Sequence, residues 1–328
     1  MKAHQPHSRS RRVFLVSITA LALASSAQAQ PTGKSITLVV PFAPGGPVDT
    51  LARALAEKLR KPDRVVLVEN RVGAGSLVAA ETVARAPANG LTLLVATQAT
   101  LVANPVLYKT LPYDPVRSFQ PIALLSETPA VLVVPASSGI ASWTDLLAAM
   151  RRSPQPYAYA SAGNGTLHHV AGEVLRASQN LQLVHVPYRG SGPALTDVLG
   201  GRVPMMFVDL STAGPHIKAG TLRPLLVTGH RRLQALPAVP TAAESGMPDL
   251  TLTSWQVLVA PAGVSDAMID ALQRDVQSAM QALAADERYA AAGFELHADM
   301  GLTRTAEFIA RERAVWTQAI KRSGATAD

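Results

Sequence analysis

The chain contains 328 residues, of which 48% are hydrophobic, 16% are charged and none is cysteine. This length and composition predict a globular protein with a sizeable core, most simply in two domains, and they exclude disulfides as a source of stability. The formal net charge is +7, but residues 30–328 hold 26 basic and 23 acidic residues, without a basic cluster interleaved with aromatic residues, which argues against nucleic-acid binding.

Residues 1–29 have the three parts of an export signal. Four basic residues come first, at Lys2, Arg9, Arg11 and Arg12. Residues 13–23 are apolar but fewer than the about 20 that a membrane span requires, and an Ala-x-Ala cleavage site ends at Ala29. Residues 10–15 resemble a twin-arginine (Tat) signal, although paired basic residues also occur in ordinary Sec signals, so both export routes stay open. We expect a periplasmic protein whose signal peptide is cleaved near Ala29.

The first structural unit spans residues 36–55, with the sequence ITLVVPFAPGGPVDTLARAL. It begins with an apolar run typical of a buried strand, and later Leu51, Leu55 and Leu59 recur at the period of a helix. A Gly-rich turn at residues 41–46 separates the two and leaves backbone N–H groups unpaired at the start of the helix. Such a turn suits an anion, a phosphate as well as a carboxylate.

The same pattern of strand, turn and helix recurs along the chain. A second unit has its strand at residues 65–68, its turn at residues 73–76 and its helix at residues 77–85, and a third strand at residues 91–96 ends at Thr97. Strands that alternate with helices predict a parallel sheet covered by helices, with ligands bound beyond the carboxyl ends of the strands. All three turns are therefore expected at one edge of the sheet.

A later region repeats this design and is expected to form a second domain. Residues 157–160 lead into a turn at residues 161–166 and a helix, and a buried strand at residues 205–208 is followed by Asp209. Two apolar runs upstream are read as one long strand that leaves the first domain and enters the second. The expected boundaries place residues 30–126 and 229–328 in the first domain and residues 127–228 in the second.

Nucleotide and metal sites are not indicated. The stretch around Gly73 and Gly75 lacks the third glycine of a dinucleotide fingerprint, and the chain contains no Walker lysine motif. His168 and His169 are adjacent, so on a helix they point about 100° apart and do not form a pair of metal ligands. We expect no cofactor.

Several polar residues allow more than one role. Ser161, His169 and Asp209 suggest a hydrolase triad, but no G-x-S-x-G elbow surrounds Ser161, so catalysis is not expected. His169 either caps or packs under the preceding turn, or contacts ligand directly. Asp49, in the first turn of its helix, either stabilises the helix dipole or accepts a hydrogen bond from a ligand. Three arginines near the expected cleft are candidates to pair with a carboxylate: Arg53, Arg71 and Arg189.

Six segments together resemble one family. They are VVPFAPGGPVDTLAR, VENRVGAGS, YASAGNGTLHHVAGE, VHVPYRGSGPALTDVLGGRV, MMFVDL and VPTAAESG. Their order and spacing resemble the substrate-binding proteins of tripartite tricarboxylate transporters, the Bug receptor family, over residues 36–320. The resemblance implies an α/β, two-domain periplasmic-binding-protein fold of the type II, Venus-flytrap class, with parallel or mixed sheets and two crossover strands. It also implies a monomer that captures a small carboxylate (a di- or tricarboxylate, an acidic amino acid or an aromatic acid) and delivers it to membrane permease subunits.

Carried over residue by residue, the resemblance implies a binding site with no catalytic residue. Its expected members are Pro44, Gly45, Gly46, Asp49, Gly73, Ala74, Gly75, Ser76 and Thr97 in the first domain, and Ser161, Gly163, Gly165, Thr166, His169 and Asp209 in the second. Pro47 departs from the family pattern and removes one N–H donor from the first turn. Two alternatives stay open: an exported hydrolase that uses Ser161 and His169, and a sensory binding protein that acts without a transporter.

Overall fold

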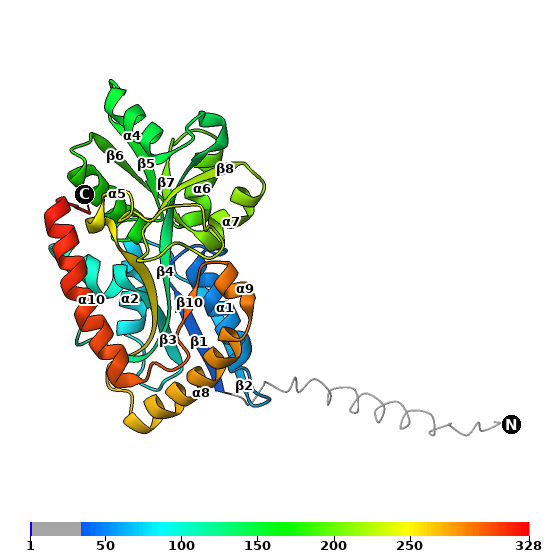
Figure 1. Cartoon of the computed structure of the whole chain (residues 1–328). Coiled ribbons are helices and arrows are strands. Elements are labelled where there is room, and N and C mark those ends of the chain that lie inside the picture. Colours follow the sequence, from blue (N-terminus) through cyan, green and yellow to red (C-terminus); the bar gives the residue numbers. More distant parts are fainter. Residues whose placement is uncertain (2–33, 328) are drawn as a thin grey trace. The chain divides into compact units, whose positions relative to one another are not determined.

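The computed structural model of the chain describes Met1 and residues 34–327, except for the side chains of Lys34 and Ala74. The expected signal peptide lies outside these residues. In the described part, ten strands form one mixed sheet in the order β2-β1-β3-β9-β4-β7-β5-β6, and β8 and β10 also pair with β4. The strands fall into two groups that share β4 (Figure 1).

The first group contains the N-terminal strands and two strands from the end of the chain. Its strands are β1 (Lys34–Val40), β2 (Arg64–Asn70), β3 (Thr92–Thr97), β9 (Thr253–Pro261), β10 (Glu295–Leu296) and the first part of β4 (Phe119–Pro135). Its helical elements are α1 (Pro47–Leu59), η1 (Ala74–Ser76), α2 (Leu77–Ala84), η2 (Ala99–Ala103), α3 (Asn104–Leu107), α8 (Asp266–Ala284), α9 (Glu287–Ala291) and α10 (Leu302–Ser323). β1 pairs with β2 and β3 in parallel, whereas β9 lies antiparallel between β3 and β4.

The second group contains the middle of the chain. Its strands are β5 (Tyr157–Ser161), β6 (Leu183–Pro187), β7 (Met206–Asp209), β8 (Leu222–Val227) and the last part of β4. Its helical elements are η3 (Ala136–Ser138), α4 (Trp143–Arg152), α5 (Leu167–Ser178), α6 (Ser191–Leu199) and α7 (Leu210–Lys218), and η4 (Pro248–Leu250) lies on the return to β9. β7 and β8 pair with β4 in antiparallel fashion, and β5 pairs with β6 in parallel.

β4 is the continuous link between the groups. The first part of this 17-residue strand pairs with β9, and the part from Ala130 onward pairs with β7 and β8. The expectation that two apolar runs form one long strand is therefore confirmed. The domain boundaries at residues 126/127 and 228/229 stay a prediction.

Alternating side chains bury both faces of the sheet. In β3, Leu93 and Val95 pack in the core cluster that contains α1 and α8, while Leu94 and Ala96 pack in the cluster that contains α2 and α10. This period of two is that of an extended strand with helices on both sides. The second of these clusters continues through Leu132 of β4 to α5, so both strand groups share a core on this face.

The C-terminal helix α10 runs along both groups (Figure 1). It packs against η2 and β4 in the first group and against α5 in the second. Near its end, Arg176 Nη2 donates to the backbone oxygen of Ser323 over 2.8 Å, and Asn164 Nδ2 donates to that of Ala327 over 2.5 Å. The helix therefore ties α5 and the preceding turn to the first group.

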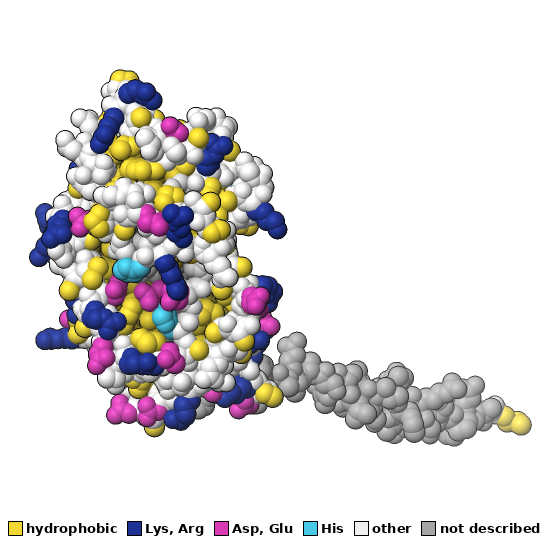
Figure 2. Space-filling view, in the orientation of Figure 1, with side chains coloured by type: hydrophobic (Ala, Val, Ile, Leu, Met, Phe, Trp, Pro, Cys, Tyr) yellow, Lys and Arg dark blue, Asp and Glu magenta, His cyan; other side chains and the backbone are white. Residues whose placement is uncertain are grey.

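The outer surface carries both signs of charge. On the face that Figure 2 shows, Lys and Arg side chains are interspersed with Asp and Glu. Within residues 34–327, no helix is both long and apolar enough to cross a membrane.

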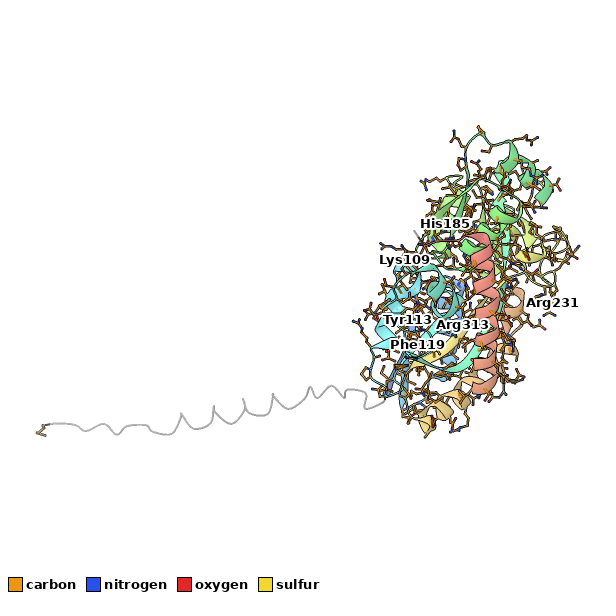
Figure 3. The ribbon with its side chains drawn as sticks, turned by 90° about the vertical axis from the view of Figure 1, so that its left-hand side faces the viewer. Lys109, Tyr113, Phe119, His185, Arg231 and Arg313 are labelled. Carbon is orange, nitrogen blue, oxygen red and sulfur yellow. The ribbon has the colours of Figure 1, made fainter. Side chains whose placement is uncertain are left out.

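Three rings form a stack between α5 and the strands β5 and β6. His185 stacks on Tyr159 with ring centroids 5.1 Å apart and on His169 with centroids 4.1 Å apart. Figure 3 places His185 in the second group, well separated from Tyr113 and Phe119 in the first. Burial lowers the pKa of His169 to about 4; burial, helped by His169, lowers the pKa of His185 to about 3. Both rings are therefore neutral at pH 7.

Gly172 allows this close packing, because a Cβ there would overlap the ring of Tyr159. We predict that Gly172→Ala lowers the free energy of unfolding by about 1–3 kcal/mol, since the ring has no space into which to move. Gly214→Ala in α7 is the matched control: its Cβ would lie 3.7 Å from Leu210 Cδ1, an ordinary contact, and Ala favours a helix. Urea unfolding of both variants measures the difference. Equal effects in the two would contradict the packing argument.

The stacked histidines predict acid sensitivity. An unfolded histidine has a pKa of about 6.5, so between that pH and the folded values the unfolded chain binds more protons, and stability falls as the pH falls from 7 towards 4. Between pH 7 and pH 4, His169 alone lowers the free energy of unfolding by about 3 kcal/mol.

Chemical unfolding at a series of pH values checks this prediction. His169→Gln and His185→Gln should each reduce the dependence of unfolding free energy on pH in this window. His230→Gln, at an exposed histidine outside the stack, is the control. An unchanged slope in both stack variants would rule out the stack as the acid-sensitive element.

Candidate functional site

A small cavity lies where the two strand groups meet. Its volume is about 30 Å³. The first group contributes the start of α1, the end of β3 and the start of β9; the second contributes the starts of α5 and α6 and the end of β7. The lining residues are Phe42, Gly46, Pro47, Val48, Thr97, Gln98, Ser254, Ala162, Thr166, Leu167, His168, Ser191 and Asp209.

Three helices place residues of their first turn in this lining: α1, α5 and α6. Each helix start carries backbone N–H groups without an intrahelical partner and a partial positive charge, which favours an anion. Within the lining, His168 and Asp209 are the ionisable side chains, and neither Lys nor Arg is present. An anion held here would therefore depend on backbone N–H groups and neutral donors.

Two lining side chains carry buried polar atoms without hydrogen bonds in the described structure. Thr97, which is 1% exposed, has an unpaired Oγ1, and both ring nitrogens of His168 lack hydrogen bonds. His168 Nε2 lies 3.0 Å from Asp209 Oδ2, a distance typical of an ion pair, but the direction does not meet hydrogen-bond geometry. We treat this approach as an electrostatic contact. Buried polar atoms are normally paired, so these atoms point to a ligand or ordered water.

The Asp49 carboxylate lies outside both cavity linings and is paired with protein donors. It receives hydrogen bonds from the backbone N–H of Gly45, over 3.0 Å, and from the side chains of Arg53 and Asn70, each over 2.9 Å. Burial acts to raise the pKa of Asp49, but these hydrogen bonds outweigh it and hold the pKa below its ordinary value. Asp49 therefore shapes the first turn, and it consumes the N–H of Gly45.

A second cavity of about 40 Å³ lies beside the first and shares Phe42 and Ala162 with it. The turn at Gly73, Gly75 and Ser76 lines it. The side chains of two nearby residues fix this turn: Asn104 Nδ2 donates to the oxygen of Gly75 over 2.8 Å, and Thr100 Oγ1 donates to Ser76 Oγ over 3.0 Å.

The turns of the two groups touch one another. Ala43 N donates to the oxygen of Arg189 over 3.3 Å. A Cβ on Gly75 would lie 2.7 Å from the oxygen of Asn164, and one on Gly165 would lie 2.7 Å from Asn104 Oδ1. Ligand pockets usually measure about 300–1,000 Å³, so the main cavity is small for a ligand site while these turns are in contact.

Ser161 and His169 are not partners. Ser161 is fully buried, and its Oγ lies 2.5 Å from His185 Nε2 and accepts from the N–H of Gly163 over 3.1 Å. His169 Nδ1 accepts from the N–H of Gly165 over 3.1 Å. The triad of Ser161, His169 and Asp209 is thus not assembled in the described structure.

The expected site residues separate into three sets. The main cavity includes Gly46, Thr97, Thr166 and Asp209, and the second includes Gly73, Gly75 and Ser76. Outside both linings lie Pro44, Gly45, Asp49, Ser161, Gly163, Gly165 and His169. The side chain of Ala74 falls outside the described part. Contact of any of these residues with a ligand stays a prediction.

Sequence reasoning missed several lining residues. They are Phe42, Gln98, Ala162, Leu167, His168, Ser191 and Ser254, whereas Pro47 and Val48 lie within the turn at residues 44–49 that the family resemblance implies. One signal was available for the histidines. Thr166 caps α5, so His169 is the third helical residue, a position whose side chain often reaches back to the cap, while His168 points elsewhere.

A metal centre is not formed by the described residues, which contain no group of three or more His, Asp or Glu side chains placed to hold an ion.

Comparison with known proteins gives consistent matches over most of the chain. A model of the tripartite tricarboxylate transporter family receptor matches residues 50–325. Protein BugT of Bordetella pertussis is 32% identical over 315 residues, which are 95% of this chain and 96% of BugT.

Two solved structures from Rhodopseudomonas palustris are similar. Rpa4515 with adipate is 30% identical with a TM-score of 0.84, over 88% of this chain and 97% of that chain. MatC (Rpa3494) with bound malate is 28% identical with a TM-score of 0.82, over 87% and 98%. These structures confirm the expected mixed α/β fold of a solute-binding protein. Since the family model covers well over half of its length, the chain belongs to the tripartite tricarboxylate transporter receptor family, which includes the Bug proteins.

Proposed function

We propose that the protein is a periplasmic receptor that binds a small carboxylate between its two strand groups and presents it to the membrane subunits of a tripartite tricarboxylate transporter. The observation that carries this proposal is the main cavity: three helix starts converge on it, and Thr97 Oγ1 is buried there without a partner. Carboxylates accept hydrogen bonds from such donors. Family membership and the adipate and malate bound by two relatives support the same ligand class.

Binding requires the cavity to open. The cavity of about 30 Å³ is well below the about 300–1,000 Å³ usual for ligand pockets, so we expect a ligand to enter when the turns near Ala43, Gly75 and Gly165 separate from their partners across the cavity. β4 and α10 span both groups. They would therefore hinge a movement in which the two groups separate as two domains. A ligand favours the closed form only through its higher affinity for that form, so donors from both groups should contact it.

The export signal and the family support a periplasmic location. We assign no catalytic step, because Ser161 is fully buried and lies outside the cavity lining. Co-purification with permease subunits, as opposed to a membrane kinase, would separate a transport receptor from a sensory one.

The ligand class is testable by titration calorimetry of the mature protein. The panel should contain C4–C9 dicarboxylates, tricarboxylates, acidic amino acids and aromatic acids, with sugars and simple cations as controls. We expect saturable binding of at least one acid and no binding of the controls. If a sugar or cation binds and every acid fails, the carboxylate proposal is wrong.

Thr97→Val tests the role of the unpaired hydroxyl. Valine has a similar shape, so removal of an unsatisfied buried group should raise the free energy of unfolding of the unliganded protein by about 1 kcal/mol, while loss of a donor to the ligand weakens affinity about tenfold.

Thr128→Val is the matched control. Thr128 on β4 is also fully buried with an unpaired Oγ1, but it does not line the cavity. It should gain stability in the same way and keep its affinity within about twofold. If both variants lose affinity equally, Thr97 has no special contact with the ligand.

A further inference from the structure

We propose that Asp209 and His168 make the cavity selective for carboxylic acids that also carry a hydrogen-bond donor, a hydroxyl or an amino group, over acids that carry carboxylates alone. This inference rests on the proposed function and narrows the ligand class of the same site. It follows from how the Asp209 carboxylate is placed.

Asp209 is the N-cap residue of α7, yet its side chain makes no capping hydrogen bond. An aspartate in this position usually accepts from the second or third N–H of its helix, which stabilises the helix. Thr166 does so at the start of α5, where its Oγ1 accepts from the N–H of His169. The Asp209 carboxylate instead contributes to the cavity lining, although it is only 2% exposed.

Few protein donors reach this carboxylate. Among residues 34–327, Ser191 Oγ donates to Asp209 Oδ2 over a long 3.4 Å, and His168 Nε2 approaches the same oxygen without hydrogen-bond geometry. An ionised carboxylate accepts at both oxygens and donates at neither. A buried carboxylate with so few donors is therefore matched by a ligand group that donates.

The charge of the lining gives the same result. Asp209 and His168 are its ionisable side chains. If His168 is protonated, the two charges cancel; if it is neutral, the lining is negative. In neither state does the lining offer a net positive side-chain charge to a ligand carboxylate near Asp209. A ligand carboxylate placed there is repelled by the carboxylate of Asp209. A hydroxyl or an ammonium group meets an acceptor in both states.

Matched sets of acids test this with the wild-type protein. Each set holds chain length constant and changes one substituent: succinate, malate and aspartate; glutarate, 2-hydroxyglutarate and glutamate; adipate, 2-hydroxyadipate and 2-aminoadipate; propionate, lactate and alanine. Both enantiomers are titrated by calorimetry at one pH. In the set that binds best, we expect the hydroxy or amino member to bind about 10- to 100-fold more tightly than the unsubstituted acid.

The outcomes separate the two proposals. If an unsubstituted acid binds as tightly as its substituted partners, this inference is overturned and the carboxylate receptor stands. If no acid of any set or of the wider panel binds, the proposed function fails and the inference falls with it. The hydroxy and amino members show which donor the site prefers.

Asp209→Asn keeps the size of the side chain and removes its charge. We expect the preference for an amino group to fall to within about threefold, because the amide is a weaker acceptor for a cation. The affinity for the unsubstituted acid should stay equal or rise. Asp197→Asn is the control, since Asp197 binds Tyr188 and Arg202 away from the cavity, and it should keep the wild-type ratio. A uniform loss of affinity for all members of a set would mean that Asp209 has only a structural role.

Discussion

The site depends on one strand that belongs to two groups at once. Because β4 pairs with β9 in its first part and with β7 and β8 in its last part, the two strand groups are held with their turns facing each other. The starts of α1, α5 and α6 then converge on one cavity. Each helix start favours an anion by about 0.3–1 kcal/mol at an exposed site and more when buried, so three together favour an anion in a lining that contains neither Lys nor Arg.

The cavity is lined by polar groups that make few or no hydrogen bonds within the described structure. Thr97 Oγ1 and the ring of His168 are buried without hydrogen bonds, and Asp209 begins α7 without capping it. Other polar side chains at helix starts are paired: Ser142 caps α4, and the Asp49 carboxylate accepts several hydrogen bonds in the first turn. Unsatisfied buried groups lower stability, so those that line a cavity are candidates to pair with a ligand.

Local pattern was sufficient for the elements but not for the directions of side chains. The apolar run at residues 36–40 and the leucines spaced three to four residues apart correspond to β1 and α1. The antiparallel insertion of β9 between β3 and β4 is a long-range pairing that no local period reports. The same limit hid Ser191 and Ser254, which reach the cavity from distant segments. His168 and His169 are adjacent on α5, so their side chains point about 100° apart, and only His168 faces the cavity. The residue at which the helix begins, Thr166, sets which of the two rings does so.

The first turn limits the backbone donors that the first strand group presents to the cavity. The N–H of Gly45 is bound to Asp49, and Pro47 has none. The lining therefore retains Gly46 and Val48 from this turn, and the first group adds polar side chains at Thr97, Gln98 and Ser254. The second group adds two helix starts together with Thr166, Ser191 and the Asp209–His168 pair. Polar groups thus face the cavity from both sides, but its one carboxylate, the acceptor on which the proposed discrimination between acids rests, belongs to the second group.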